Sequence, residues 1–158
     1  MDSDDFKAAL GRFGSGVTII TTYGQGGTPQ GFTASSFCSL SIDPPLVLFC
    51  LARDATAFQA FAASETFGVN ILTRAQSDLS GRFAEKRSDK FDGVPLMGGE
   101  WRTPLLPGCL ANLQCRTTQT FPGGDHLIIV GEVGQVHLGE GDPLIYHRGR
   151  YGTLGPTD

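Results

Sequence analysis

The sequence predicts a single domain of mostly β structure, built as a barrel of short strands with a few inserted helices. Three observations support this fold class. The 158 residues are enough for one domain and leave little room for a second. Glycine accounts for 22 of them and proline for 9, which implies many turns. Strand-like runs follow one another without strand–helix–strand alternation, which disfavours a doubly wound parallel sheet.

Strand-like runs make up most of the chain. A turn at 24–27 separates the first two, and its Gly-Gly pair supplies the positive φ that a tight hairpin needs. The run Leu46–Leu51 is apolar on both faces, so we expect a central buried strand. Residues 84–108 are polar and rich in glycine and proline, which indicates a long functional or interface loop. We expect strands at Val17–Tyr23, Gln30–Ser36, Leu46–Leu51, Phe67–Leu72, Leu110–Phe121, His126–Leu138 and Leu144–His147.

Three helices are expected among these strands. Ser3 can cap the first and Asp54 the second, because their side-chain oxygens can accept from unpaired N–H groups. Thr73 and Gln76 match a capping box that opens the third. The apolar faces comprise Phe6, Ala9, Leu10 and Phe13 in the first helix, Phe58, Phe61 and Ala62 in the second, and Ala75, Leu79 and Phe83 in the third.

Charge and composition disfavour several classes of protein. With 16 acidic and 12 basic residues the net charge is −4, and no basic run suits nucleic acid. The apolar stretch Leu46–Ala52 is too short to span a membrane, and the acidic segment Met1–Asp5 does not resemble a secretory signal. The cysteines lack a C-x-x-C pair, so we expect buried free thiols, no metal site and a reducing cytoplasm. They are Cys38, Cys50, Cys109 and Cys115.

Small hydroxyl residues crowd the segment Gly31–Ser41, where a core strand would carry bulky side chains. Small side chains allow a flat ligand to approach the backbone, whose N–H and C=O groups can pair with the polar edge of a heterocycle. An isoalloxazine ring has such an edge. The alternative is a serine-rich edge strand that faces water.

A second candidate site joins the buried strand to the second helix, over residues 52–56. Unpaired N–H groups and the helix dipole favour an anion there, and Arg53 or Thr56 could add to them. The alternative is an ordinary capped helix beside a solvated arginine.

Among the histidines, His126 differs from the other two because it follows a Gly-Gly-Asp turn at the mouth of a long strand. There an imidazole could orient a nicotinamide, although a surface histidine is the alternative. His137 and His147 have no partner at metal-ligand spacing. Near the C-terminus, the cluster Tyr146–Tyr151 combines aromatic and cationic side chains that could hold a pyrophosphate or form the rim of a dimer.

Together these segments resemble the short flavin reductase family, the FMN-binding split-barrel proteins that serve as reductase components of two-component flavin monooxygenases. The resemblance covers nearly the whole chain, and the second and fifth blocks are its most specific parts. The blocks are Phe13–Thr22; Gly31–Phe37 with Ser39, Ser41 and Asp43–Val47; Val69–Leu72; Asp89–Phe91; and Gly124–His126 with Gly131–Val133. The tail Pro143–Tyr146, with Gly149 and Tyr151, is similar too.

The resemblance implies a six-stranded Greek-key split barrel that works as a homodimer, with one FMN-binding domain over residues 1–158. It implies an NAD(P)H:flavin oxidoreductase, in which hydride passes from NADH or NADPH to FMN or FAD. Reduced flavin would then reach a partner monooxygenase, or react with dioxygen or ferric complexes. The protein's task would be to orient the two cofactors.

The resemblance also implies roles for individual residues. Flavin ring and ribityl contacts fall on Thr33, Ala34, Ser35, Ser36 and Ser39, and the phosphate end on Ala52, Arg53, Asp54 and Thr56. Phe83, Lys90 and Phe91 would border the same groove, while His126, taken as the catalytic residue, and Tyr151 would contact the nicotinamide. One departure is that family members often carry serine at the position of Ala55, whereas this chain has its hydroxyl at Thr56.

Two other kinds of function remain open on the same barrel. One is a flavin oxidase or a reductase of another substrate, such as a cobalamin precursor. The other is a non-catalytic module that binds flavin or haem. The choices between FMN and FAD, NADH and NADPH, and prosthetic and exchangeable flavin remain open too.

Overall fold

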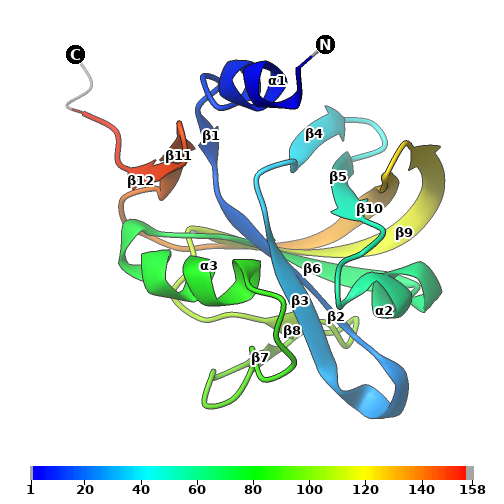
Figure 1. The fold of residues 1–158 in the computed structure, drawn as a ribbon. Helices are drawn as coiled ribbons and strands as arrows, with labels where there is room; N and C mark the ends of the chain where they lie inside the picture. The colour runs from blue at the N-terminus through cyan, green and yellow to red at the C-terminus, as the bar shows by residue number, and fades with distance from the viewer. Residues whose placement is uncertain (1, 156–158) are drawn as a thin grey trace.

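Seven antiparallel strands form the main sheet of this computed structural model, which describes residues 2–155 (Figure 1). They are β2 (Thr18–Tyr23), β3 (Pro29–Ala34), β4 (Cys38–Ser41), β5 (Leu46–Ala52), β6 (Thr66–Ile71), β9 (Ala111–Gly123) and β10 (His126–Leu138). Their order is β3-β2-β6-β9-β10-β5-β4. The predicted mostly β fold is therefore confirmed. The count exceeds the predicted six because β4 is a separate short strand paired with β5.

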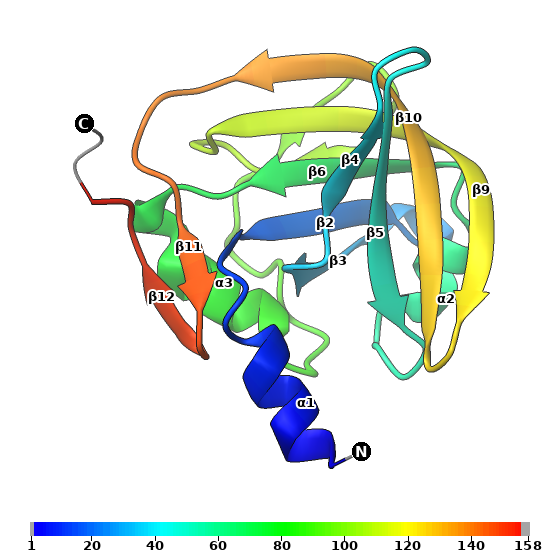
Figure 2. The same cartoon turned by 90° about the horizontal axis from the view of Figure 1, so that it is seen from above.

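Smaller elements surround the main sheet, as the view from above shows (Figure 2). A three-stranded sheet joins β1 (Ser15–Gly16), β11 (Ile145–His147) and β12 (Arg150–Gly152), and a short pair joins β7 (Met97–Gly98) and β8 (Pro104–Leu105). The helices are α1 (Ser3–Leu10), α2 (Phe58–Ala63) and α3 (Ser77–Ala84), with 3₁₀ turns η1 (Gln25–Gly27) and η2 (Arg74–Gln76). No helix among residues 2–155 is long and apolar enough to cross a membrane.

Aromatic side chains dominate the larger of two core clusters. Phe49 and Phe67 are fully buried and meet edge to face, with ring centroids 5.0 Å apart. Phe61 of α2 packs edge-on against both Phe49 and Phe32. The second cluster lies around Phe83 of α3. These contacts fix α2 and α3 against the main sheet, because edge-to-face pairs and close packing both favour one arrangement.

A buried asparagine attaches the 84–108 segment to the sheet. The Asn70 amide donates to the Ile19 carbonyl at 2.9 Å, and its Oδ1 accepts from the Leu106 N–H and from Asn112, each at 2.8 Å. Leu105 and Leu106 are thereby held in the core. The segment predicted as a polar loop thus contains two fully buried leucines, which its overall polarity did not indicate.

The hairpin turn and the third helix follow their local sequence signals. Gly26 and Gly27 have φ of 73° and 75°, as predicted for the turn between β2 and β3. The predicted capping box of Thr73 and Gln76 is also confirmed. Local chemistry settled both features, because each depends on residues at most three positions apart.

The caps of the first two helices were predicted wrongly. Asp2 caps α1 by accepting from the Asp4 N–H at 2.9 Å, one residue before the expected Ser3. The second helix begins at Phe58 with Ala57 at its N-cap and no side-chain cap, so Asp54 lies three residues too early to cap it. Turn hydrogen bonds occupy the residues between, and the Asp54 carboxylate binds Lys86 at 2.6 Å.

Several predicted burials were also wrong. Ala62 of α2 is exposed, because that helix buries only Phe61, and Ala75 is exposed in the turn η2, before α3 begins. Strand β5 buries Val47, Phe49 and Leu51 but leaves the alternate residues half exposed, so one face rather than two lies in the core. Cys38 is exposed and Cys50 half buried, because they lie on that outer surface near the edge of the sheet. Only Cys109 and Cys115 have the expected buried thiols.

Candidate functional site

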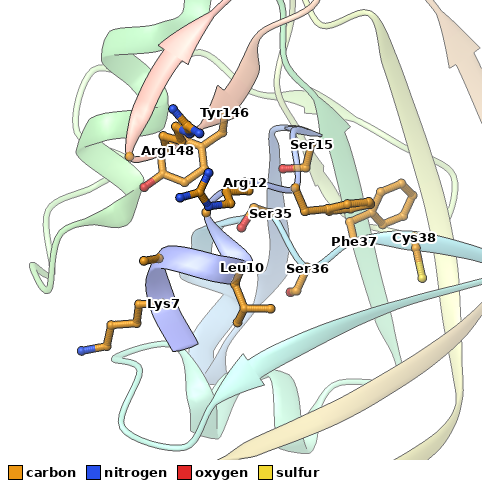
Figure 3. Close-up of a pocket in the computed structure, with 14 residues that line it drawn as sticks. Lys7, Leu10, Arg12, Ser15, Ser35, Ser36, Phe37, Cys38, Tyr146 and Arg148 are labelled. Carbon is orange, nitrogen blue, oxygen red and sulfur yellow. The ribbon is translucent and has the colours of Figure 1, made fainter. Parts of the chain in front are cut away.

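A large cavity opens beside the hydroxyl-rich segment between β3 and β4 (Figure 3). We call it the Ser35 cavity, and its volume is about 1130 Å³. It is lined by Lys7, Ala8, Leu10, Gly11, Arg12, Phe13, Ser15, Ser35, Ser36, Phe37, Cys38, Tyr146, Arg148 and Gly149. Helix α1, the loop after β3 and the turn between β11 and β12 therefore meet at one hollow, large enough for a nucleotide cofactor.

The two serines of this cavity have different environments. The Ser36 hydroxyl donates to the carbonyl of Cys50 and accepts from its N–H, both at 3.1 Å. These contacts stand in for backbone pairing just before β4 begins, so Ser36 holds the cavity wall against β5. The Ser35 side chain is exposed, and no hydrogen bond among the described residues occupies its hydroxyl. Ser35 therefore keeps its donor and both acceptor positions for a ligand.

Other residues predicted for the flavin lie around this cavity rather than in its lining. Thr33 donates its hydroxyl to the Ser80 carbonyl at 2.6 Å, and Ala34 is buried in the core. Ser39 is exposed on β4, opposite Val47. These residues position the cavity wall, and their direct contact with a flavin remains a prediction.

Residues 52–56 lie at the far end of β5. Ala52 pairs with His126 on β10, and the Arg53 N–H donates to the Asp125 carbonyl at 2.9 Å. The ion pair of Asp54 with Lys86 lowers the pKa of that carboxyl. Thr56 lines a different cavity, of about 700 Å³, between α2 and the β2–β3 hairpin. The predicted phosphate end is thus divided between two places.

Phe83, Lys90 and Phe91 form a structural unit beneath β3. Phe83 is fully buried and packs edge to face on Phe91, with centroids 4.8 Å apart. Lys90 is 6% exposed and donates to the Phe83 carbonyl at 3.0 Å and the Gly31 carbonyl at 3.4 Å. Burial lowers the pKa of its amine. In this chain Phe83 and Lys90 support the groove wall, and neither presents free surface to a ligand.

The two residues predicted to contact the nicotinamide lie far apart in the folded chain. The His126 Nδ1 lies 2.7 Å from a carboxylate oxygen of Asp125, and this bond lowers the pKa of Asp125. The Tyr151 hydroxyl lies 2.7 Å from the Ser80 hydroxyl, and its ring lies 5.8 Å from that of Tyr146. Figures 1 and 2 place β12 and the β9–β10 hairpin on opposite sides of the molecule. One chain therefore does not bring His126 and Tyr151 together.

Sequence reasoning missed several residues of the Ser35 cavity. Tyr146 and Arg148 belong to the C-terminal cluster that was predicted to hold a pyrophosphate or to form the rim of a dimer, so a signal existed for them, but the sequence did not connect that cluster to Ser35. Arg12 and Lys7 come from α1, and nothing in their local sequence indicates a site. Their distance along the chain from Ser35 explains why only the fold reveals them.

The architecture and the cavity define a mostly β protein with a nucleotide-sized groove beside a hydroxyl-rich strand end. Residues 10–155 match the flavin reductase like domain family. The chain belongs to this family, as its resemblance predicted.

Two curated relatives and one solved structure illustrate the similarity. The chain is 40% identical to an actinorhodin polyketide dimerase of Streptomyces coelicolor, over 97% of this chain and 87% of that protein. It is 39% identical to the reductase subunit HsaB of a flavin-dependent monooxygenase of Mycobacterium tuberculosis, over 99% and 84%. A structure of the Streptomyces globisporus NADH:FAD oxidoreductase SgcE6, in complex with NAD and FAD fragments, superposes with a TM-score of 0.92 at 36% identity, covering 98% of this chain and 94% of that one. The predicted flavin reductase activity is confirmed at the level of the family.

Proposed function

We propose that this protein is a homodimeric, single-domain NAD(P)H-dependent flavin reductase that supplies reduced FMN or FAD to a partner flavin-dependent monooxygenase. The observation that carries the proposal is the Ser35 cavity, which opens beside the family's most specific sequence block. Relatives named as reductase components of monooxygenases support the partner. The four free cysteines of the described residues support a reducing, cytoplasmic location.

The residues present fit a flavin. The cavity has apolar surface from Leu10, Phe13 and Phe37, which suits an aromatic ring system, and the free Ser35 hydroxyl suits a polar ring edge. Arg12 and Arg148, which Figure 3 shows on the other side of Ser35 from Phe37, suit an anionic tail. When bound, a flavin would supply the hydride acceptor, and the protein needs no side-chain nucleophile.

The chain's own residues bind and orient. Ser35 donates to or accepts from the ring edge, while Ser36 keeps the wall in place through the Cys50 backbone. Asp125 holds the imidazole of His126 through Nδ1, which leaves Nε2 to contact a carboxamide. Tyr151, held by Ser80, forms a second aromatic contact on the other side of the barrel. His126 orients the hydride donor in this proposal and transfers no proton.

The homodimer rests on apolar surface next to the cavity. Helix α1 buries none of its residues, and Phe6, Leu10 and Phe13 are 49%, 57% and 80% exposed. Leu10 and Phe13 also line the Ser35 cavity, so a second copy that covers this stripe would also close the groove. Closure by a second copy would exclude water from the ring. Apolar surface of this kind marks an interaction site.

The test combines activity with oligomeric state. The purified protein with added FMN or FAD should oxidise NADH or NADPH in steady state, and light scattering should give twice the chain mass. Leu10→Glu should shift the protein toward monomer and weaken flavin binding together. A wild-type monomer with full flavin affinity would remove the dimer from the proposal. Flavin or haem binding without NAD(P)H oxidation would favour the non-catalytic module, and oxidation only with another acceptor would favour a reductase of a different substrate.

A further inference from the structure

Positive charge gathers on one side of the Ser35 cavity. Its lining includes Lys7, Arg12 and Arg148 and no aspartate or glutamate. This distribution is selective, because the chain has 16 acidic against 12 basic residues and a net charge of −4. A cavity whose charge opposes that of the whole protein concentrates anions.

These cations have little neutralisation from the protein itself. Lys7 lies 4.0 Å from Asp4 one helical turn away, with both side chains largely exposed. Neither Arg12 nor Arg148 forms an ion pair with any of residues 2–155. Two guanidinium groups that share a cavity without a carboxylate leave their N–H donors available to an anion.

The backbone at Arg148 has a left-handed conformation that is unfavourable for arginine. Arg148 and Gly149 form the two-residue turn between β11 and β12, with φ of 51° and 74°. Glycine or asparagine adopts this left-handed conformation more readily than arginine. The Arg148 N–H also donates to the Gly11 carbonyl at 2.7 Å, which joins the turn to the residue before Arg12. This hydrogen bond and the left-handed turn together fix where the Arg148 side chain leaves the backbone, at the cavity.

The cavity also separates its cationic and apolar parts. Figure 3 shows Arg12 and Arg148 beside Tyr146 on one side, with Phe37 and Cys38 on the other. Ser35 lies between the two sides. A ligand with an aromatic ring at one end and a phosphate at the other matches this arrangement.

We propose that Arg148 and Arg12, assisted by Lys7, bind the phosphate or diphosphate group of a nucleotide in the Ser35 cavity. The inference rests on the function proposed above and places the anion here instead of at residues 52–56. Guanidinium groups suit it because they can donate two parallel hydrogen bonds to phosphate oxygens. The phosphate could belong to the flavin or to the nicotinamide nucleotide, and ligands with and without phosphate distinguish the two.

The test uses two matched arginine-to-glycine variants. Arg148→Gly removes an arginine side chain from the cavity. Arg102→Gly removes an arginine side chain outside the cavity, at the other described non-glycine residue with a positive φ, 54°. The melting temperature of both variants should equal that of the wild type or exceed it by up to about 2–4 °C, because glycine adopts the left-handed conformation without the strain that arginine has there. Arg12→Gln is the second cavity variant.

Binding of FMN, FAD and riboflavin is measured by fluorescence titration, and KM is measured for NADH and for 1-benzyl-1,4-dihydronicotinamide. If the phosphate belongs to the flavin, Arg148→Gly and Arg12→Gln weaken FMN and FAD binding about tenfold or more and leave riboflavin unchanged. If it belongs to the nicotinamide nucleotide, the KM for NADH rises similarly and that for the phosphate-free donor does not. Arg102→Gly should change neither.

Equal flavin affinities together with equal KM values for NADH in Arg148→Gly, Arg12→Gln and Arg102→Gly would overturn the inference. Equal weakening of phosphate-bearing and phosphate-free ligands would overturn it too, because the side chains would then only shape the cavity. A wild-type protein that binds FMN without oxidising NADH would refute the proposed function, while the flavin titrations would still decide the phosphate site.

Discussion

The neighbouring residues Ser35 and Ser36 should separate ligand binding from folding when each is replaced by alanine. Both line the Ser35 cavity, but only the Ser36 hydroxyl is engaged, with the backbone of Cys50. Ser36→Ala should therefore lower the free energy of unfolding, while Ser35→Ala should lower flavin affinity. Each variant serves as the control for the other, because both remove one hydroxyl from the same segment.

The magnitudes follow from the contacts. Two hydrogen bonds of 3.1 Å are lost in Ser36→Ala, and each contributes about 0.5–1.5 kcal/mol. Because the serine is exposed, we expect the lower part of that sum, about 1–2 kcal/mol, or a melting temperature lower by about 2–8 °C. Ser35→Ala should stay within about 0.5 kcal/mol of the wild-type stability. Loss of one neutral contact should weaken flavin binding about two- to tenfold.

Stability is measured by urea unfolding at one fixed protein concentration, because dimerisation would make it depend on concentration. Flavin affinity is measured by fluorescence titration. Wild-type flavin affinity in Ser35→Ala would show that its hydroxyl faces only water. Wild-type stability in Ser36→Ala would show that the Cys50 contacts contribute nothing to folding, and the reasoning above would fail.

Three further predictions concern other parts of the molecule. His126→Ala should leave flavin affinity unchanged and reduce kcat/KM for NADH several-fold to tens-fold, whereas an unchanged value would make the imidazole structural. Gly131→Ala should lower the free energy of unfolding by about 1–3 kcal/mol, because the new methyl would lie 2.4 Å from a buried phenylalanine ring. Gly81→Ala, in α3 with open space around it, should raise stability by up to about 1 kcal/mol, and equal effects of the two substitutions would contradict the packing argument. The hydrogen bond from Arg87 lowers the pKa of Asp89 to about 2. The stability that this ion pair adds is therefore present above about pH 4 and is lost as the pH falls toward 2. The melting temperature of Arg87→Gln should lie below that of the wild type at pH 6 and converge with it at pH 2.

Local chemistry made part of this protein readable from its sequence. Gly26 and Gly27 predicted the hairpin turn because few other residues accept their backbone conformation. Thr73 and Gln76 predicted a helix start because each satisfies an N–H group within one turn. The family was evident because its motifs are continuous segments, such as the block from Gly31 to Phe37.

The sequence could not predict which surfaces the fold would bury or leave open. The stripe of Phe6, Leu10 and Phe13 has ordinary helical spacing, yet the chain covers none of it. Phe83 was expected to border the groove, and the fold buries its ring fully, against Phe91, which no local pattern indicated. Periodicity indicates that a face is apolar, whereas burial depends on which distant elements pack against that face.

The groove itself depends on contacts between distant parts of the chain. Arg12 and Arg148 lie near opposite ends of the sequence, and their segments are joined by the hydrogen bond from the Arg148 N–H to the Gly11 carbonyl and by the pairing of β1 with β11. The sequence determined the family, the strand-rich architecture and the hydroxyl-rich segment, because each is encoded in neighbouring residues. Only the tertiary structure placed two guanidinium groups beside Ser35, because that placement follows from packing between α1 and the β11–β12 turn, which no local pattern specifies.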